Sequence, residues 1–107
     1  MDYYKNVDEL DWQVGNVVGF SSKKLLSLTG SNFKLVKVAP FAIYPVHVHP
    51  NKNEVLLILE GTISATIDDK IYKGKPSDIF VFPVGIKHSI INTSNKECIV
   101  FIASMNN

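Results

Sequence analysis

The stretch "PVHVHPNKNEVLLILEG", from Pro45 to Gly61, decides how the sequence is interpreted. It contains two of the three histidines of the chain, His47 and His49, and Glu54 follows five residues after the second. On a β-strand, residues i and i+2 point to the same face and lie about 6.5–7 Å apart along the chain. The spacing therefore predicts two imidazoles that point into one space.

Glu54 joins these histidines only if the chain reverses between them. An odd spacing on one continuous strand would send Glu54 to the face opposite His49. The intervening residues "PNKN", Pro50–Asn53, include proline and asparagine, which favour turns. We therefore predict a turn at Pro50–Asn53, with His49 near the end of one strand and Glu54 near the start of the next.

The third histidine, His88, lies in "PVGIKHSIIN". Pro83 and Gly85 predict a turn between two strands there, so every histidine of the chain lies near a strand–turn junction. Three neutral imidazoles and one carboxylate suit a divalent transition metal such as Mn, Fe, Co, Ni, Cu or Zn. With four protein ligands, an octahedral ion keeps two positions open for substrate, water or O₂, which is typical of a catalytic site.

Short strands dominate from Asn32 onward. A turn signal recurs about every 6–12 residues, which is typical of an antiparallel sandwich or closed barrel. Residues 1–31 are less clear and are expected to form an N-terminal strand or cover segment, with the barrel core at 32–104 in one domain of residues 1–107. The expected strands are "NFKLVKVAPFAIYP" (32–45, broken at Pro40 and Pro45), "EVLLILE" (54–60), "TISATID" (62–68), "KIYKG" (70–74), "DIFVFP" (78–83), "KHSIIN" (87–92) and "ECIVFIAS" (97–104).

The composition limits the classes of molecule that the chain is expected to bind. The 107 residues fit one domain, with 46% apolar and 20% charged residues. The net charge is +1 and no basic run exceeds Lys23–Lys24, which argues against a nucleic-acid partner. All 11 basic residues are lysines. An anionic ligand would therefore be held by lysine, by backbone amides or by a metal, because the bidentate arginine clamp is absent.

The chain gives no sign of export or of a membrane. Cys98 is the only cysteine, so no intrachain disulfide can form, and we interpret it as a small buried hydrophobe rather than a reactive thiol. The first residues, "MDYYKNVDELDW", lack the basic and apolar regions of a signal peptide. No apolar run approaches the ~20 residues of a membrane helix. We expect a cytoplasmic location.

Both histidine segments resemble the two motifs of the cupin superfamily, in the form found in small single-domain cupins. The first family motif is His-x-His, four residues, Glu, six residues, Gly, and the second is Pro-x-Gly, two residues, His, three residues, Asn. The matching residues are His47, His49, Glu54 and Gly61, then Pro83, Gly85, His88 and Asn92. The resemblance covers about half of the chain, Phe41–Asn92. It implies an all-β fold, a single antiparallel jelly-roll β-barrel, with one divalent transition metal (Fe, Mn, Ni, Cu or Zn) held inside by His47, His49, Glu54 and His88.

Two positions depart from the family pattern. Many cupins carry glycine six residues before the first histidine, where this chain has Phe41. They also often carry Gly-Asp before the strand that leads to the proline, where this chain has Ser77–Asp78. Both are turn positions, so the departures concern loop shape and the pocket entrance and remove no ligand.

Several residues of the motif region have a structural interpretation. We expect Asn92 to make a turn or backbone contact, and Gly61 and Gly85 to serve turns. We interpret the four phenylalanines Phe41, Phe80, Phe82 and Phe101 as core, with some of them lining an apolar pocket. Trp12 is expected to cover a sheet edge or to contribute to a dimer contact.

The resemblance implies a metal-dependent enzyme that acts on a small organic molecule. Cupins similar to this one, with three histidines and one glutamate, include dioxygenases, oxalate-metabolising enzymes, sugar isomerases and lyases. The absence of arginine disfavours phosphorylated sugars and dicarboxylates, and the apolar strands favour an uncharged or aromatic substrate. We therefore favour a dioxygenase-type oxidoreductase. No catalytic residue is assigned, but Glu54 is a candidate base and Tyr44 a candidate proton donor.

Two alternatives stay open at this point. One is a non-catalytic cupin that binds or senses a metal or small molecule, and the other is a metal-assisted sugar isomerase. Small cupins commonly pair, and sheet edges need covering, so we also expect a homodimer.

Overall fold

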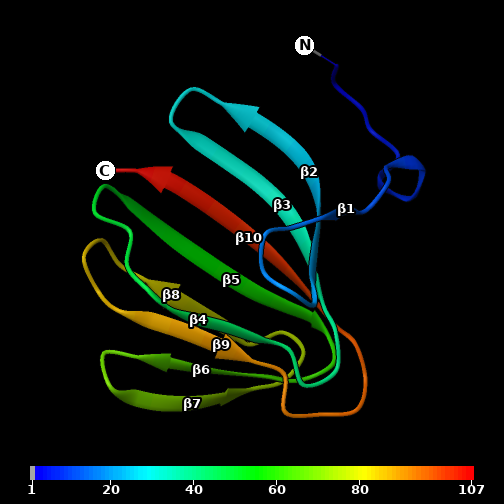
Figure 1. Ribbon diagram of the computed structural model, residues 1–107. Helices are drawn as coiled ribbons and strands as arrows, with labels where there is room; N and C mark the ends of the chain where they lie inside the picture. Colours follow the sequence, from blue (N-terminus) through cyan, green and yellow to red (C-terminus); the bar gives the residue numbers. More distant parts are fainter. Residues whose placement is uncertain (1) are drawn as a thin grey trace.

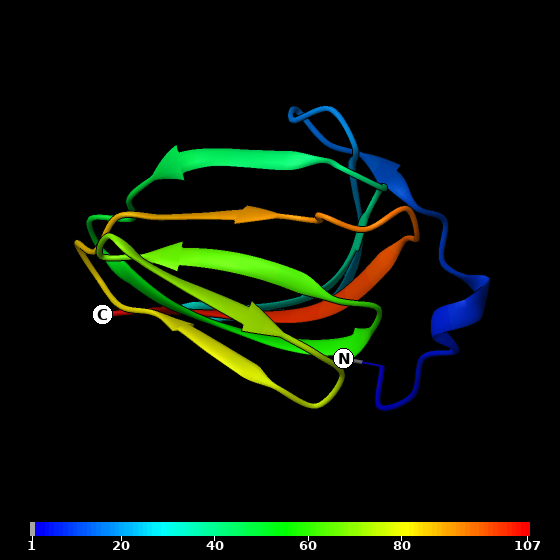
Figure 2. The same cartoon turned by 90° about the horizontal axis from the view of Figure 1, so that it is seen from below.

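The computed structural model describes residues 2–107 and shows two antiparallel sheets packed face to face (Figures 1 and 2). The larger sheet has the order β1-β2-β3-β10-β5-β8 and the smaller has the order β4-β9-β6-β7. The strands are β1 (Gln13–Val14), β2 (Phe20–Leu28), β3 (Ser31–Val38), β4 (Ile43–His47), β5 (Lys52–Glu60), β6 (Ile63–Ile67), β7 (Lys70–Gly74), β8 (Ile79–Phe82), β9 (His88–Ile91) and β10 (Cys98–Asn106). The expected all-β jelly roll is confirmed, although the two sheets do not close into one continuous barrel within the described residues.

The N-terminal segment supplies two strands of the larger sheet, β1 and β2. Strand β2 pairs with β3 along its length, and its first residue, Phe20, belongs to the buried core. A short 3₁₀ helix, Val7–Glu9, precedes it, and the Lys23 ammonium donates a hydrogen bond to the Val7 carbonyl over 3.0 Å. The Trp12 ring lies 4.8 Å from Lys23 Nζ and 4.6 Å from Lys37 Nζ, so it covers the outer face of β2 and β3.

The expected break at Pro45 was wrong. Strand β4 runs through Pro45 to His47, with a register shift between Tyr44 and His47. Proline fits here because β4 is an edge strand. On an edge strand every second backbone N–H points away from the sheet, so a residue without an N–H costs no strand-pairing hydrogen bond. The other expected strands are present, and β5 begins two residues before Glu54, at Lys52.

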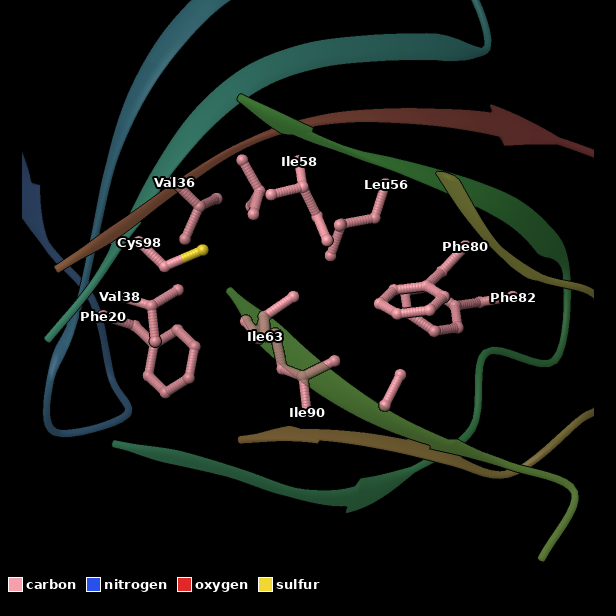
Figure 3. Packing of buried hydrophobic residues seen from close by; sticks show 12 residues of the cluster. Phe20, Val36, Val38, Leu56, Ile58, Ile63, Phe80, Phe82, Ile90 and Cys98 are labelled. Atoms are coloured by element: carbon pink, nitrogen blue, oxygen red, sulfur yellow. The ribbon is translucent and has the colours of Figure 1, made fainter. Parts of the chain in front are cut away.

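The core lies between the two sheets (Figure 3). Its most deeply buried apolar side chains include Leu56 and Ile58 of β5 and Ile63 of β6. Cys98 is also fully buried, and burial raises the pKa of its thiol to about 11, in agreement with its interpretation as a small hydrophobe.

The phenylalanines divide between inside and outside. Phe80 and Phe82 are in the core, as expected. Phe41 is 63% exposed in a turn, and Phe101 lies half-buried on the outer face of the larger sheet, so the core interpretation was wrong for these two. The alternation of side chains along β10, which buries Val100, sends Phe101 outward.

Among the described residues, no helix is long and apolar enough to cross a membrane.

Candidate metal centre

The four residues expected to bind a metal meet between the two sheets. Their ligand atoms all lie within 4.8 Å of one another. His47 ends β4 and His88 begins β9, and the two are direct register partners. His49 lies in the loop after β4, and Glu54 is on β5 of the opposite sheet. The site is therefore built from both sheets and from the loop that connects them.

The reversal that brings Glu54 to the histidines lies slightly earlier than predicted. The connection between the strands spans residues 48–51, and β5 has begun by Lys52. Two hydrogen bonds tie this loop and the start of β5 to the second motif. The Gly85 N–H donates to the His49 carbonyl over 2.9 Å, and the Val84 N–H donates to Asn53 Oδ1 over 2.9 Å. The two motif loops therefore hold each other in place.

Backbone carbonyls fix the tautomers of two histidines. Nδ1 of His47 lies 2.8 Å from the Pro45 carbonyl, and Nδ1 of His88 lies 3.1 Å from the Ile86 carbonyl. A carbonyl oxygen only accepts, so Nδ1 of each ring must carry the proton. Nε2 of each ring is then left with a free lone pair directed into the cluster. Metal-binding histidines are commonly held in this way, with the nitrogen that faces away from the metal donating to a backbone carbonyl.

His88 has a buried nitrogen that needs a partner. Its exposed fraction is 3%, and Nε2 is the one buried side-chain nitrogen or oxygen atom without a hydrogen bond among residues 2–107. Glu54 Oε1 is the nearest acidic atom, at 4.0 Å, which is too long for a hydrogen bond. An unpaired buried polar atom costs free energy. A metal ion would satisfy this one.

Glu54 is also held in a fixed direction. It is 8% exposed, and its Oε2 accepts a hydrogen bond from the Ser104 hydroxyl over 3.1 Å. Its Oε1 lies 2.9 Å from Nε2 of His49, and Lys52 Nζ lies 3.8 Å from Oε2. Ser104 reaches the site because it is the register partner of Glu54 on β10. The carboxylate is therefore oriented from one side and faces the histidines from the other.

The surroundings favour the neutral form of the imidazoles. Burial lowers the pKa of His88 below its ordinary value, and the neighbouring rings of His47 and His49 act in the same direction. Burial also lowers the pKa of His49, while the Glu54 carboxylate opposes the shift. A neutral imidazole is the form that binds a metal. The ring of Phe82 stacks on that of His88 at 4.2 Å with an angle of 10°, and this holds the ligand ring in place.

The residue types and their spread fit a single transition-metal ion. Metal–nitrogen bonds are about 2.0–2.1 Å long, so two ligand atoms on one ion lie within about 4.2 Å. The observed spread of 4.8 Å is close to this value. Three imidazole nitrogens and one carboxylate oxygen leave room for further ligands on metals of the Mn-to-Zn series.

A cavity of about 260 Å³ opens onto these four residues. Its polar wall contains two cations that the sequence reasoning missed, Lys34 and Lys52, and also Tyr44. Tyr44 packs its ring 4.7 Å from that of His47 and 5.1 Å from that of Phe20. The apolar wall is formed by Val17, Phe20, Val36, Leu56, Ile90 and Ile102.

Two of the missed residues, Lys34 and Ser104, lie on strands outside the two motifs. Lys34 lies opposite Ile102 across β3 and β10, and Ser104 lies opposite Glu54 across β10 and β5. Their positions depend on the strand register, and no local motif contains them. A signal does exist in the sequence, since Lys34 and Ser104 interrupt the apolar inward positions of their strands.

Comparisons with known proteins agree with this architecture. A family model described as "Cupin domain" matches residues 34–104. This chain belongs to the cupin family. A putative germin-like protein 2-1 from Oryza sativa subsp. japonica is 32% identical to it over 85 residues, or 73% of this chain and 39% of the relative. Germin-like protein subfamily 1 member 20 from Arabidopsis thaliana is 32% identical over 100 residues, or 83% and 45%. The cupin chain thus spans less than half the length of these relatives.

Two solved structures superpose on nearly the whole chain. A predicted oxalate decarboxylase from Thermotoga maritima has a TM-score of 0.88 at 22% identity and covers 95% of this cupin and 97% of its own chain. KdgF from Halomonas sp. has a TM-score of 0.87 at 18% identity and covers 100% and 96%. At such identities the likeness establishes the fold alone.

Proposed function

We propose that this cupin is a metal-dependent enzyme that acts on a small organic molecule, and we favour a dioxygenase-type oxidation. The observation that carries the proposal is the buried, unpaired Nε2 of His88, which faces three further ligand atoms at the wall of an open cavity. A structural metal site is closed by its ligands, whereas a catalytic site keeps access for a substrate. When bound, the metal would supply Lewis acidity or a place for O₂ and substrate to meet.

The cavity supports a substrate with one anionic group and an apolar body. Lys34 takes part in no ion pair within residues 2–107, so its charge is available to a ligand. Lys52 is 3.8 Å from Glu54 and adds a second positive charge. The remaining wall is largely apolar. The sequence alone favoured an uncharged substrate, whereas the two lysines now favour a small carboxylic acid or enolate. They supply the positive charge that arginine would provide in other proteins.

Tyr44 and Glu54 differ as candidates for proton transfer. Tyr44 lines the cavity beside His47 and could present its hydroxyl to a bound molecule. Glu54 already accepts a hydrogen bond from Ser104 and contacts His49, so it serves better as a ligand than as a free base. We therefore assign the proton-donor role to Tyr44 and the ligand role to Glu54.

The test is oxygen consumption by protein loaded with Fe(II), with a panel of small aliphatic and aromatic hydroxy and oxo acids. The proposal predicts turnover with at least one acid and loss of about tenfold or more in kcat/KM for Lys34→Ala, because a charge-assisted contact is removed. Lys73→Ala, on β7 away from this cavity, is the matched control and should keep its activity.

The other candidate functions are separated by the same acid panel and by a second, anaerobic assay with sugars. Binding of an acid without O₂ uptake or product would point to a non-catalytic binding cupin. Turnover of a sugar under anaerobic conditions would point to a metal-assisted isomerase. Equal activity of Lys34→Ala and wild-type protein would contradict the anionic substrate class.

A further inference from the structure

Two lysines stand directly opposite each other on the inner face of the larger sheet. Lys24 of β2 is the register partner of Lys34 of β3, and these two strands lie side by side (Figure 1). Lys34 is two residues before the buried Val36, so it shares the inward face, and it lines the cavity. Directly opposed residues share one face of a sheet, so Lys24 points the same way, where it is exposed. We call Lys24 and Lys34 the lysine pair.

The lysine pair has no carboxylate to balance its charge. Neither Lys24 nor Lys34 forms an ion pair within residues 2–107. Lys52, the other lysine of the cavity wall, differs, since its ammonium lies 3.8 Å from the Glu54 carboxylate. Like charges directly opposite on neighbouring strands destabilise a sheet. The lysine pair therefore costs the free protein stability, and an anion between the two ammonium groups would remove this cost.

The register places the lysine pair away from the metal ligands. Lys34 is opposite Ile102 on β10, Ile102 is opposite Leu56 on β5, and Glu54 is two residues before Leu56. With strands about 4.8 Å apart and a rise of about 3.3 Å per residue, the Cα atoms of Lys34 and Glu54 lie roughly 12 Å apart along the sheet. Ile102 and Leu56 lie between them, and both line the cavity. This wall of the cavity thus has a metal ligand at one end, an apolar middle and positive charge at the other end.

We propose that the lysine pair binds an anionic group at the end of the substrate that is far from the metal. The inference rests on the proposed function and specifies the substrate class. The substrate would have a metal-binding oxygen group at one end, a short apolar body over Ile102 and Leu56, and a carboxylate or phosphate at the other end. Lys24, which lies outside both histidine motifs, then becomes a residue that determines specificity.

The repulsion within the lysine pair gives a test that needs no metal. Lys24→Gln removes one charge and keeps a long polar side chain. It should raise the midpoint of thermal unfolding of metal-free protein by about 1–5 °C at low salt, because the repulsion is lost. The gain should shrink in about 1 M NaCl, which screens the charges. An unchanged or lower midpoint at low salt would overturn the proposal.

The matched control is Lys96→Gln, in the loop between β9 and β10, because Lys96 is exposed and also forms no ion pair within residues 2–107. It should leave the midpoint unchanged, and an equal gain in this variant would overturn the role of the opposed charges.

Anions should act on the same midpoint. Acetate or inorganic phosphate, compared at equal ionic strength, should raise the midpoint of wild-type protein, since a ligand that binds only the folded state stabilises it. The increase should be smaller in Lys24→Gln. A larger effect of phosphate would identify a phosphate as the bound group, and a larger effect of acetate would identify a carboxylate. No increase with either anion would overturn the proposal.

Binding by Zn(II)-loaded protein tests the position of the anionic group. Isothermal titration calorimetry compares 2-oxoadipate with 2-oxohexanoate, which has a methyl group in place of the far carboxylate. Zn(II) has no redox chemistry, so both acids bind without being oxidised. Wild-type protein should bind 2-oxoadipate at least about tenfold more tightly, because the far carboxylate gains charge-assisted contacts.

The variants show whether that preference comes from the lysine pair. Lys24→Gln/Lys34→Gln should lose the preference and keep its affinity for 2-oxohexanoate, and Lys24→Arg, which keeps the charge, should retain the preference. Equal affinity of wild-type protein for the two acids, or an unchanged preference in the double variant, would overturn the proposal. Failure to bind Zn(II) would contradict the proposed function, and the metal-free midpoints would then decide the role of the lysine pair by themselves.

Discussion

The two ends of the space between the sheets differ in whether their buried polar side chains have hydrogen-bond partners. Asn92 and His88, four residues apart, show this difference. Asn92 is fully buried, and its side chain donates to the carbonyls of Val38, Ala39 and Lys96 and accepts from Ser94. His88, four residues earlier, is almost as buried and leaves Nε2 unpaired. We call the region of Asn92 the closed end and that of His88 the metal end.

The inward positions of the central strands follow the same division. On β5 they change from Glu54 to Leu56 and Ile58, and on β10 from Ser104 to Val100 and Cys98. The register places Glu54 beside Ser104, so the polar positions gather at one end. A polar side chain with all partners present stabilises the fold, whereas one that lacks a partner is available to a ligand. The closed end therefore serves stability and the metal end serves binding.

The largest effect on stability is expected at the closed end. Asn92→Ala should lower the free energy of unfolding by about 2–4 kcal/mol, because it leaves buried carbonyls without donors. His88→Ala should lower the unfolding free energy of metal-free protein less, because it removes one hydrogen bond and one ring stack but also removes the unpaired buried Nε2. Urea denaturation of both variants without metal measures the difference. Equal destabilisation would erase the distinction between the two ends.

Two glycines give a smaller and more local comparison. Gly61 and Gly85 both have left-handed backbones, with φ of 78° and 75°. A Cβ at Gly61 would lie 2.7 Å from the Glu97 carbonyl oxygen, whereas one at Gly85 would have no atom within 4 Å. Gly85→Ala should cost about 1 kcal/mol from the backbone alone, and Gly61→Ala should cost at least about 1 kcal/mol more. Thermal unfolding of the pair checks this, and similar midpoints would contradict the close contact.

Substitution in the opposite direction should stabilise the protein. Phe41 and Ser77 stand where many cupins have glycine, and both are in the left-handed region, with φ of 62° and 78°. Ser77→Gly should raise the free energy of unfolding by about 0.5–1 kcal/mol, because the strain exceeds the added entropy of the unfolded chain. Urea denaturation measures this gain. A loss of stability would show that the serine side chain makes a contribution larger than the strain.

The smallest response is expected from Cys98 at the closed end. Burial raises the pKa of the thiol to about 11, so at pH 8 it is protonated as well as inaccessible. A thiol reagent at pH 8 should leave native protein unmodified for as long as it stays folded and should modify unfolded protein at one site. Rapid labelling of the native protein would mean that the closed end opens to solvent.

Histidine spacing and turn formers are local features of the chain, and they predicted that His47, His49 and Glu54 converge and that the fold is an antiparallel sandwich or barrel. The jelly roll and the complete ligand set with His88 followed from the resemblance to cupins. The sequence also predicted a backbone contact for Asn92 and a turn at Gly61. Asn92 donates to the Lys96 carbonyl, and Gly61 has a left-handed backbone, as expected. Ser104 and Lys34 could not be found in this way, because they reach the site through the register of distant strands. The outward direction of Phe101 likewise depends on strand pairing.

The measurement that tests the central claim most directly is metal binding by the metal end. Untagged protein is stripped of metal and titrated with Fe(II), Mn(II), Ni(II), Cu(II) or Zn(II), and bound metal is counted by elemental mass spectrometry in wild-type, His88→Ala and Ser89→Ala proteins. Ser89 is the next residue on β9 and points to the outer face, which makes its variant the matched control. We predict about one bound metal per chain in wild type and Ser89→Ala, and a loss of at least about tenfold in affinity in His88→Ala. Absence of uptake by wild type, or equal uptake by folded His88→Ala, would contradict the claim.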